Sequence, residues 1–351
     1  MGLARILAAA GIAAAKWLGI GSAAYGLFHS GLLHGKFSAA RFAESAAGFA
    51  RTASYRGTVA AGVLYLSAVV LAVAFQRKLI FFPTEEDCPP GASLAAEGMS
   101  GVRDVEITTA DGETLKAYAW APLGAPGLLG RPLGDVWLVV MHGNAGTRYM
   151  RMGWFHMLRR QLGVGILAVD YRGYGGSTGA PSQAGLYADG EAVVAWLRGG
   201  AGGLVPADHR VVLYGESIGS SVCTWMATRA RFDGLILHAP FTSVAEAGQM
   251  IYPILPVKWL MSERFDTMSF ARDVAEGTPK LVLHGRLDNI VPFVLGARLY
   301  DRLAEPKKFV PIDGADHNNI PMFKREYLSS LASFLEGVAA APAQRVSGKG
   351  E

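Results

Sequence analysis

Short apolar runs alternate with longer amphipathic stretches over most of the chain from about residue 100 onward. Two strand-length segments, residues 102–109 and 114–121, flank Asp111-Gly112. The apolar runs follow at residues 136–141, 164–169, 211–214, 235–238, 280–284 and 308–312. The amphipathic stretches predict helices near residues 148–162, 184–199, 217–230, 293–304 and 322–337. Continuous apolar strands that alternate with helices are typical of a mostly parallel sheet covered on both faces. The pattern therefore predicts an α/β fold, with a hairpin at Asp111-Gly112 between its first two strands.

The N-terminal part of the chain carries a different pattern, an apolar stretch without any charged residue. It covers Gly57–Gln76, between Arg56 and Arg77. A helix of this length is roughly 30 Å long, which matches the hydrocarbon thickness of a bilayer. A buried helix of a water-soluble domain is the alternative, but such helices rarely run so far without a polar face. We therefore predict a transmembrane helix at residues 57–76.

Residues 1–56 form an Ala-rich extension whose role stays open. Within it, residues 6–28 are apolar, but Lys16 stands in the middle, where a charge is costly in a bilayer. A weak first span, a signal peptide and an interfacial helix are all compatible with this stretch. Residues 29–56 carry four basic residues, against two directly after the predicted span, and this bias slightly favours an extracytoplasmic location for the rest of the chain. A cleaved signal peptide would reverse that orientation. The chain is thus predicted to be a membrane protein with one or two spans.

Composition narrows the possible partners. Hydrophobic residues make up 51% of the chain and the mean hydropathy is +0.24, which is high for a soluble enzyme. The formal charge of +4 comes without a basic stripe or a nucleic-acid-reading motif, so nucleic acid is not an expected partner. The two cysteines, Cys88 and Cys223, lack metal-ligand spacing, and no metal site is expected.

The most informative motif is Gly215–Gly219, with the sequence GESIG, directly after the apolar run 211–214. It has the form G-x-S-x-G of a nucleophile elbow, where a strand turns sharply into a helix and exposes the serine hydroxyl. Glycines suit this crowded turn because side chains there would collide with the neighbouring strand and helix. The string alone recurs by chance in a chain with 44 Gly, but the apolar strand before it and the helix-compatible run after it favour the elbow. Ser217 is therefore the candidate nucleophile.

A serine at such an elbow needs a base, and the order along the chain is serine, acid, histidine. Only His284 and His317 lie well past Ser217 with room for an acid between. His284 lies at the end of an apolar run, where a structural role is the better explanation. His317 lies in a polar loop after the run 308–312, and we predict that it is the base.

The acid must be held rigidly, which favours a position just beyond the end of a core strand. Asp288 meets this condition because it follows the apolar run 280–284. Asp313 and Asp316 are its rivals because they are close to His317 in the sequence. Most other carboxylates between nucleophile and base lie in amphipathic stretches. The predicted catalytic residues are therefore Ser217, Asp288 and His317.

An oxyanion hole requires two backbone N–H groups aimed at the developing negative charge. One is expected from Ile218, the residue after the nucleophile. The other is expected from the loop after the apolar run 136–140, where Asn144 is the first choice and Ala145 the second. His142, in the same loop, precedes both serine and acid and is expected to brace the loop.

Two further segments are candidates for shaping the site. Residues 170–177 are Gly-rich at a strand end, but they lack the G-K-[ST] ending of a phosphate loop, so a structural turn is the better interpretation. Residues 241–279 form a segment of about 40 residues between two predicted strands. Its bulky apolar stretch, which includes Tyr252 and Trp259, would either bind an acyl chain or pack on the domain.

Several of these motifs, taken in order along the chain, resemble the α/β-hydrolase superfamily, and in particular its membrane-tethered serine hydrolases and their bacterial relatives. The matching segments are Gln76–Pro83, His142–Gly146, Asp170–Gly175, Gly215–Gly219, Pro240–Ser243, the segment around Asp288, and His317–Asn319. Residues 1–55 do not match that pattern.

The resemblance implies an α/β-hydrolase domain over residues 77–340 with a small lid near residues 241–279. The sequence of residues 341–351 predicts a disordered tail. The resemblance also implies hydrolysis of carboxylic ester or thioester bonds, on an acylated lipid or protein, through an acyl-enzyme and without metal or organic cofactor. An amidase or peptidase of the same fold, and a non-catalytic membrane scaffold, are the alternatives. The fold does not choose among substrates.

Overall fold

The computed structural model describes residues 39–344 and 346, except residues 85, 87, 125, 126, 128, 129, 131 and 132. The chain divides into two units with the boundary between Phe75 and Gln76. Each unit is described by itself below. Residues 6–28, for which the sequence leaves three interpretations open, lie outside the described residues.

The second unit is built on an eight-stranded sheet in the order β1-β2-β4-β3-β5-β6-β7-β8, within the described residues. The strands are β1 (Val102–Thr108), β2 (Thr114–Trp120), β3 (Val136–Met141), β4 (Gly165–Val169), β5 (Arg210–Glu216), β6 (Gly234–His238), β7 (Lys280–Gly285) and β8 (Lys307–Ile312). The strands β1 and β2 pair antiparallel, as do β2 and β4, and all remaining pairs are parallel. The mostly parallel α/β sheet that the apolar runs predict is thereby confirmed. The edge at which the parallel strands end is called the carboxyl edge below.

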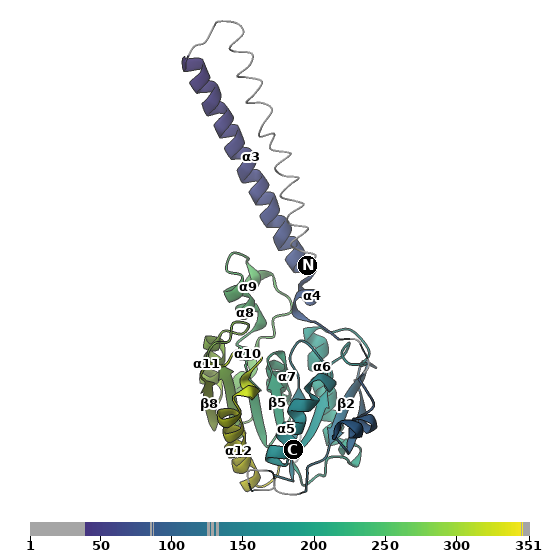
Figure 1. Cartoon of the computed structure of the whole chain (residues 1–351). Helices are drawn as coiled ribbons and strands as arrows, with labels where there is room; N and C mark the ends of the chain where they lie inside the picture. The colour runs from purple at the N-terminus through teal and green to yellow at the C-terminus, as the bar shows by residue number, and fades with distance from the viewer. Residues whose placement is uncertain are drawn as a thin grey trace. The chain divides into compact units, whose positions relative to one another are not determined.

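Helices cover both faces of this sheet (Figure 1). Alternate residues of a strand point to opposite faces and join different cores. The covering helices are α5 (Met152–Leu162), α6 (Gln183–Arg198), α7 (Ile218–Arg229), α11 (Phe293–Arg302) and α12 (Lys324–Ala340). In β3, Trp137 and Val139 join the core under α6, α7 and α11, whereas Leu138 and Val140 join the core under α5 and α12. This two-sided burial explains why the central strands β3 and β4 are apolar throughout. All five predicted helices are present, each within a few residues of its expected bounds.

Short helices inside the predicted lid were not expected from the sequence. They are α8 (Val244–Ile251), α9 (Val257–Leu260) and α10 (Thr267–Phe270). Ser243 caps α8 by accepting a hydrogen bond from the N–H of Glu246, and Asp266 caps α10 in the same way from Ser269. Elements of one or two turns are too short to show a helical period in the sequence, so such caps are their main signal.

The first unit contains one described helix, α3 (Ala39–Ala74). Its segment Ser54–Ala74 has a mean hydropathy of 2.1 and is not buried. Among the described residues, this is the one helical segment long and apolar enough to cross a bilayer. The expected bounds of 57–76 need correction, because the helix starts earlier and ends at Ala74. A separate short helix, α4 (Gln76–Ile80), follows it. The Ala-rich sequence before Ser54 has high helix propensity, which explains the extension toward the N-terminus.

The first residues of the predicted tail contact the domain. Arg210 donates a hydrogen bond to the carbonyl of Ala341, with 2.6 Å between Nη2 and O, and the N–H of Gln344 donates to Asp233. Residue 345 and residues 347–351 lie outside the described part of the chain.

Candidate active site

The elbow Gly215–Gly219 forms a strained turn between β5 and α7. Ser217 has φ 52° and ψ −114°, a backbone conformation that costs a non-glycine residue about 1–3 kcal/mol. A Cβ on Gly215 would lie 2.4 Å from the carbonyl oxygen of Gly219, and one on Gly219 would lie 2.0 Å from that of Met141. Both distances are far below van der Waals contact, so the crowding inferred from the motif is present at both glycines. The turn holds the Ser217 side chain at the carboxyl edge.

The imidazole of His317 connects Ser217 to Asp288. Its Nε2 lies 3.1 Å from the Oγ of Ser217, and its Nδ1 lies 2.7 Å from the Oδ2 of Asp288. A carboxylate only accepts hydrogen bonds, so the proton of the neutral ring belongs on Nδ1 and Nε2 is the free acceptor for the serine hydroxyl. The three residues come from the ends of β5 and β7 and the loop after β8, which the parallel sheet brings to one edge.

The carboxyl of Asp288 is fixed from several directions. Its Oδ1 accepts hydrogen bonds from the N–H groups of Ile290 and Val291, at 3.0 and 2.7 Å. The Nε2 of the buried His284 lies 3.3 Å from Oδ2. Burial opposes ionisation, but the hydrogen bonds from His284 and His317 outweigh it and hold the pKa of Asp288 below its usual range. Asp288 therefore stays charged near neutral pH, and His284 has the structural role that its position predicted.

The rival carboxylates are bound elsewhere. Asp313 is exposed and pairs with Arg286, with 2.6 Å between Oδ1 and Nε. Asp316 accepts hydrogen bonds from the N–H groups of Asn318 and Asn319 and so closes its own turn. Proximity in sequence did not bring either one to the Nδ1 of His317.

Of the two predicted oxyanion donors, Ile218 lies within the elbow and Asn144 lies in the loop after β3. Ile218 is the first residue of α7, so its N–H has no acceptor within the helix. The loop of Asn144 is held in place through that residue, whose carbonyl accepts from the N–H of Phe82 at 3.0 Å and the hydroxyl of Tyr174 at 2.9 Å. The Asn144 side chain donates to the carbonyl of Ile80 at 2.8 Å. The carbonyl and the side chain of Asn144 thus hold its loop in place, and the oxyanion role of its backbone N–H stays a prediction.

Arg151 and Glu216 link the elbow to this loop, and the sequence did not indicate them. The Nε of Arg151 donates to the Oε2 of Glu216 at 2.8 Å, while its Nη1 lies 3.4 Å from the carbonyl oxygen of Thr147. Burial opposes ionisation of Glu216, yet the charge and hydrogen bonds of Arg151 lower its pKa to about 2. The sequence offered one signal for this pair, the glutamate inside the GESIG motif, but its partner Arg151 lies 65 residues away.

Two neighbouring features are structural. His142 is buried, its Nδ1 lies 2.6 Å from the carbonyl oxygen of Gly143, and its ring packs against Tyr171, so it braces the loop as expected. In the Gly-rich segment 170–177, the buried Asp170 pairs with Arg148, and the chain closes a hydrogen-bonded turn. The structural interpretation of this segment agrees with these contacts.

The two predicted substrate-binding residues lie on the surface of the lid. The side chains of Tyr252 and Trp259 are 58% and 84% exposed. Tyr252 directly follows α8, and Trp259 lies in α9. They are not part of the hydrogen-bonded group around Ser217.

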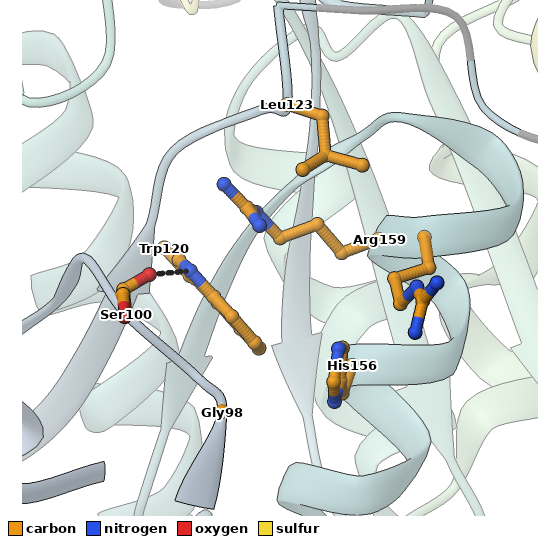
Figure 2. A pocket seen from close by; sticks show the side chains of 7 residues that line it. Gly98, Ser100, Trp120, Leu123, His156 and Arg159 are labelled. Carbon is orange, nitrogen blue, oxygen red and sulfur yellow. Dashed lines mark hydrogen bonds between the residues drawn. The ribbon is translucent and has the colours of Figure 1, made fainter. Parts of the chain in front are cut away.

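A separate pocket of about 620 Å³ lies away from this site. Figure 2 shows its lining residues, Gly98, Ser100, Trp120, Leu123, His156 and Arg159, to which Arg160 is added. Trp120 ends β2, which runs antiparallel to β4, so the pocket lies at the edge opposite to the carboxyl edge. The guanidinium of Arg159 stacks 4.6 Å above the Trp120 ring and donates to the carbonyl of Ala121. The pocket contributes no residue to the candidate active site.

The chain is similar in sequence to a family model and to several known proteins. Residues 136–277 match the family model of the alpha/beta hydrolase fold. An uncharacterized protein of Mycobacterium tuberculosis is 36% identical over 283 residues, which cover 80% of this chain and 95% of that protein. Human alpha/beta hydrolase domain-containing protein 17B is 31% identical over 199 residues, 56% of this chain and 65% of that protein.

Solved structures share the fold at lower identity. An esterase of Pyrococcus furiosus superposes with a TM-score of 0.55 at 20% identity, covering 74% of this chain and 98% of that chain. An alpha-beta hydrolase of Vibrio vulnificus gives a TM-score of 0.55 at 18% identity, covering 71% and 88%.

Proposed function

The chain belongs to the α/β-hydrolase superfamily, and on that premise we propose that it is a membrane-anchored serine hydrolase of ester or thioester bonds. Ser217 is the nucleophile, His317 the general base and acid, and Asp288 the residue that orients His317. The N–H groups of Ile218 and Asn144 stabilise the oxyanion. Residues 77–340 form the catalytic domain and the apolar part of α3 forms the anchor.

One observation carries this proposal, the continuous hydrogen-bonded series from Ser217 through His317 to Asp288. A hydroxyl is a weak nucleophile at neutral pH unless an adjacent base accepts its proton. A buried, charged Asp288 keeps the imidazole in the tautomer with a free Nε2 and stabilises the imidazolium that forms. A scaffold without catalytic function would not require this alignment of three polar side chains at a strained turn.

The proposed reaction has two stages, acylation of Ser217 and hydrolysis of the acyl-enzyme. The Oγ of Ser217 attacks the carbonyl carbon while Nε2 of His317 takes the hydroxyl proton, and the resulting oxyanion accepts hydrogen bonds from the two N–H groups. Collapse of this intermediate breaks the bond to the alcohol or thiol, which receives the proton from His317. A water then attacks the acyl-enzyme, giving one proton to His317. The carboxylic acid leaves as the proton returns to Ser217.

The anchor and the fold relatives support the substrate class. A catalytic domain directly after a transmembrane helix is held where acylated lipids and proteins reside. One structural relative is named as an esterase, which agrees with an ester substrate. Amides undergo the same chemistry with a poorer leaving group.

A fluorophosphonate probe on the purified full-length chain tests the proposal, because only an activated serine is labelled. We expect the labelled peptide to contain Ser217 by tandem mass spectrometry, and p-nitrophenyl esters and acyl-thioesters to be hydrolysed faster than aminoacyl amides. Absence of labelling, or labelling at another serine, would contradict the assignment. Faster turnover of the amides would move the chain to the amidase alternative.

A further inference from the structure

Large apolar side chains that are exposed on the second unit gather at its carboxyl edge. Among the described residues of that unit, all but one of them lie on segments that follow the ends of parallel strands or on the chain that enters the domain. They are Leu79, Phe82, Met150, Met250, Ile251, Tyr252, Ile254, Trp259, Leu260, Leu287, Ile290, Val294 and Met322. The exception is Leu123, at the opposite edge. This concentration of exposed apolar area at one edge indicates an interaction surface.

The lid carries the densest part of this area. We define the lid surface as Met250, Ile251, Tyr252, Ile254, Trp259 and Leu260. Ile254 is 80% exposed and Trp259 is 84% exposed. Residues 247–262 contain no acidic residue, whereas Lys258 and Arg264 are basic and exposed. Aromatic and aliphatic side chains beside basic ones are typical of surfaces that lie in the headgroup region of a bilayer.

The chain that follows the apolar helix is bonded directly to this lid. The Oε1 of Gln76 accepts a hydrogen bond from the N–H of Ser262 at 2.8 Å. The Nε of Arg77 donates to Glu263 at 2.6 Å, and the Glu263 side chain is only 5% exposed. The second oxygen of Glu263 accepts from the N–H of Gln183, so the connection continues to α6. Figure 1 shows α4 at the end of the domain that carries α8 and α9.

The length of the intervening chain limits how far the lid can be from the membrane. Only Phe75 separates Ala74, the last residue of α3, from Gln76. Consecutive Cα atoms are about 3.8 Å apart, so Gln76 lies within about 8 Å of the end of the apolar helix. Because Gln76 and Arg77 are bonded to the lid, the chain leads from the end of the apolar helix directly to the lid.

We propose that the lid surface is a second membrane-contact site that inserts into the headgroup region of the bilayer beside the anchor. This inference rests on the anchor in the proposed function. The contact turns the carboxyl edge, with Ser217, toward the lipid, so that an ester or thioester on a long acyl chain reaches the nucleophile without crossing water. The occupant of the lid surface is lipid, and the substrate class is an acyl compound resident in the membrane.

Spin labels on the full-length chain test this contact directly. The chain, with Cys88→Ser to remove the half-buried thiol, is reconstituted in vesicles of phosphatidylcholine and phosphatidylglycerol. Single labels are introduced through Ile254→Cys and Trp259→Cys, with Leu123→Cys as the matched control at the opposite edge. We expect the labels at 254 and 259 to collide more with oxygen than with a water-soluble nickel chelate, and the label at 123 to show the reverse.

Other results would overturn the contact. Labels at 254 and 259 that behave like the control would place the lid surface in water. Labels shielded from both oxygen and the nickel chelate would indicate a protein partner, such as a second copy of the chain.

A kinetic arm separates this inference from the proposed function. Leu260→Ser and Ile254→Ser should lower turnover of a vesicle-embedded acyl ester by about fivefold or more, because access from the bilayer is lost, while p-nitrophenyl acetate turnover stays within about twofold. Equal loss on both substrates would contradict a membrane role. Failure of the wild-type chain to hydrolyse either ester would contradict the hydrolase assignment, while the label depths still decide the lid contact.

Discussion

The elbow and the lid surface belong to the same edge of the sheet but are built in opposite ways. At the elbow, Gly215 and Gly219 have no room for a single added carbon, and Ser217 is held in a strained conformation. On the lid, Ile254 and Trp259 are 80% and 84% exposed. The elbow is held by strands on both sides, whereas the lid consists of short capped helices.

The difference separates two requirements of the proposed reaction. Proton transfer needs atoms held within hydrogen-bonding distance, which strand ends provide. Capture of a substrate from a bilayer needs an apolar surface that contacts lipid in place of water. Changes at the elbow should therefore alter the chemical step on any substrate, and changes on the lid should alter the choice of substrate.

The largest effect is expected from Ser217→Ala. Removal of the nucleophile should lower kcat by roughly 10⁶-fold, and fluorophosphonate labelling should disappear. The fold should persist because loss of one hydroxyl at a turn opens no cavity. Ser262→Ala, at an exposed serine of the lid, is the control and should keep full labelling. More than a few per cent of residual activity in Ser217→Ala would show that the nucleophile lies elsewhere.

Asp288→Asn should follow, with a loss of about 10⁴-fold in kcat on a short ester, because the amide favours the wrong tautomer of His317. Asp313→Asn, at the carboxylate that pairs with Arg286, is the matched control and should change kcat little. Steady-state kinetics of both variants decide the matter. A greater loss from Asp313→Asn or Asp316→Asn would move the acid to that residue.

Arg151→Ala should lower kcat by about 10–100-fold with little change in KM, because the elbow and the Asn144 loop lose the group that aligns them. Arg151→Lys should restore part of the loss. Arg298→Ala, which removes an ion pair to Glu246 on α8, is the control. A rise in KM at constant kcat would instead assign Arg151 to substrate binding.

The stability of the elbow region should depend on pH through two buried histidines. Burial lowers the pKa of His142 and of His238 to about 4, against an ordinary value near 6.5. The unfolded chain therefore binds these protons first as the pH falls, so stability is complete above pH 6.5 and declines toward pH 4. Full titration of each histidine is worth roughly 3 kcal/mol.

His238→Gln should roughly halve this decline, because His142 remains. The midpoint of thermal unfolding in detergent, followed by tryptophan fluorescence between pH 7 and 4, measures the slope. Identical slopes for wild type and variant would exclude His238 as a source of the pH dependence.

The smallest effect on the chemical step is expected from deletion of residues 1–75. The cut preserves Gln76, which is bonded to the lid. The truncated protein should leave the membrane fraction, yet hydrolyse short soluble esters within about twofold of the full-length rate, since the site lies wholly in the second unit. Persistent membrane binding after a high-salt wash would identify a further anchor. Loss of short-ester activity in a folded truncation would show that the N-terminal segment supports the site.

Several features of the fold were predictable because they depend on local pattern. The central parallel strands β3 and β4 are apolar throughout because both of their faces are buried, and the Asp111-Gly112 turn signal located the first two strands. The GESIG motif and its flanks identified the turn, because only glycine fits at Gly215 and Gly219. The capped helices of the lid were not recognised, since a single turn leaves no periodic signal. The bounds of the apolar helix shifted because charge-free length does not define where a helix ends.

The sequence by itself determined the α/β sheet, the elbow, and the few polar residues after the elbow that could serve as acid and base. Tertiary structure decided which of them meet. Asp288, and not Asp313 or Asp316, lies against His317, because β7 and β8 are parallel neighbours whose ends reach the same edge. The pairing of Arg151 with Glu216 and the exposure of Trp259 likewise depend on which surfaces the fold brings together or leaves open. A sequence carries the chemistry of each side chain, but distances and burial arise only when distant segments pack.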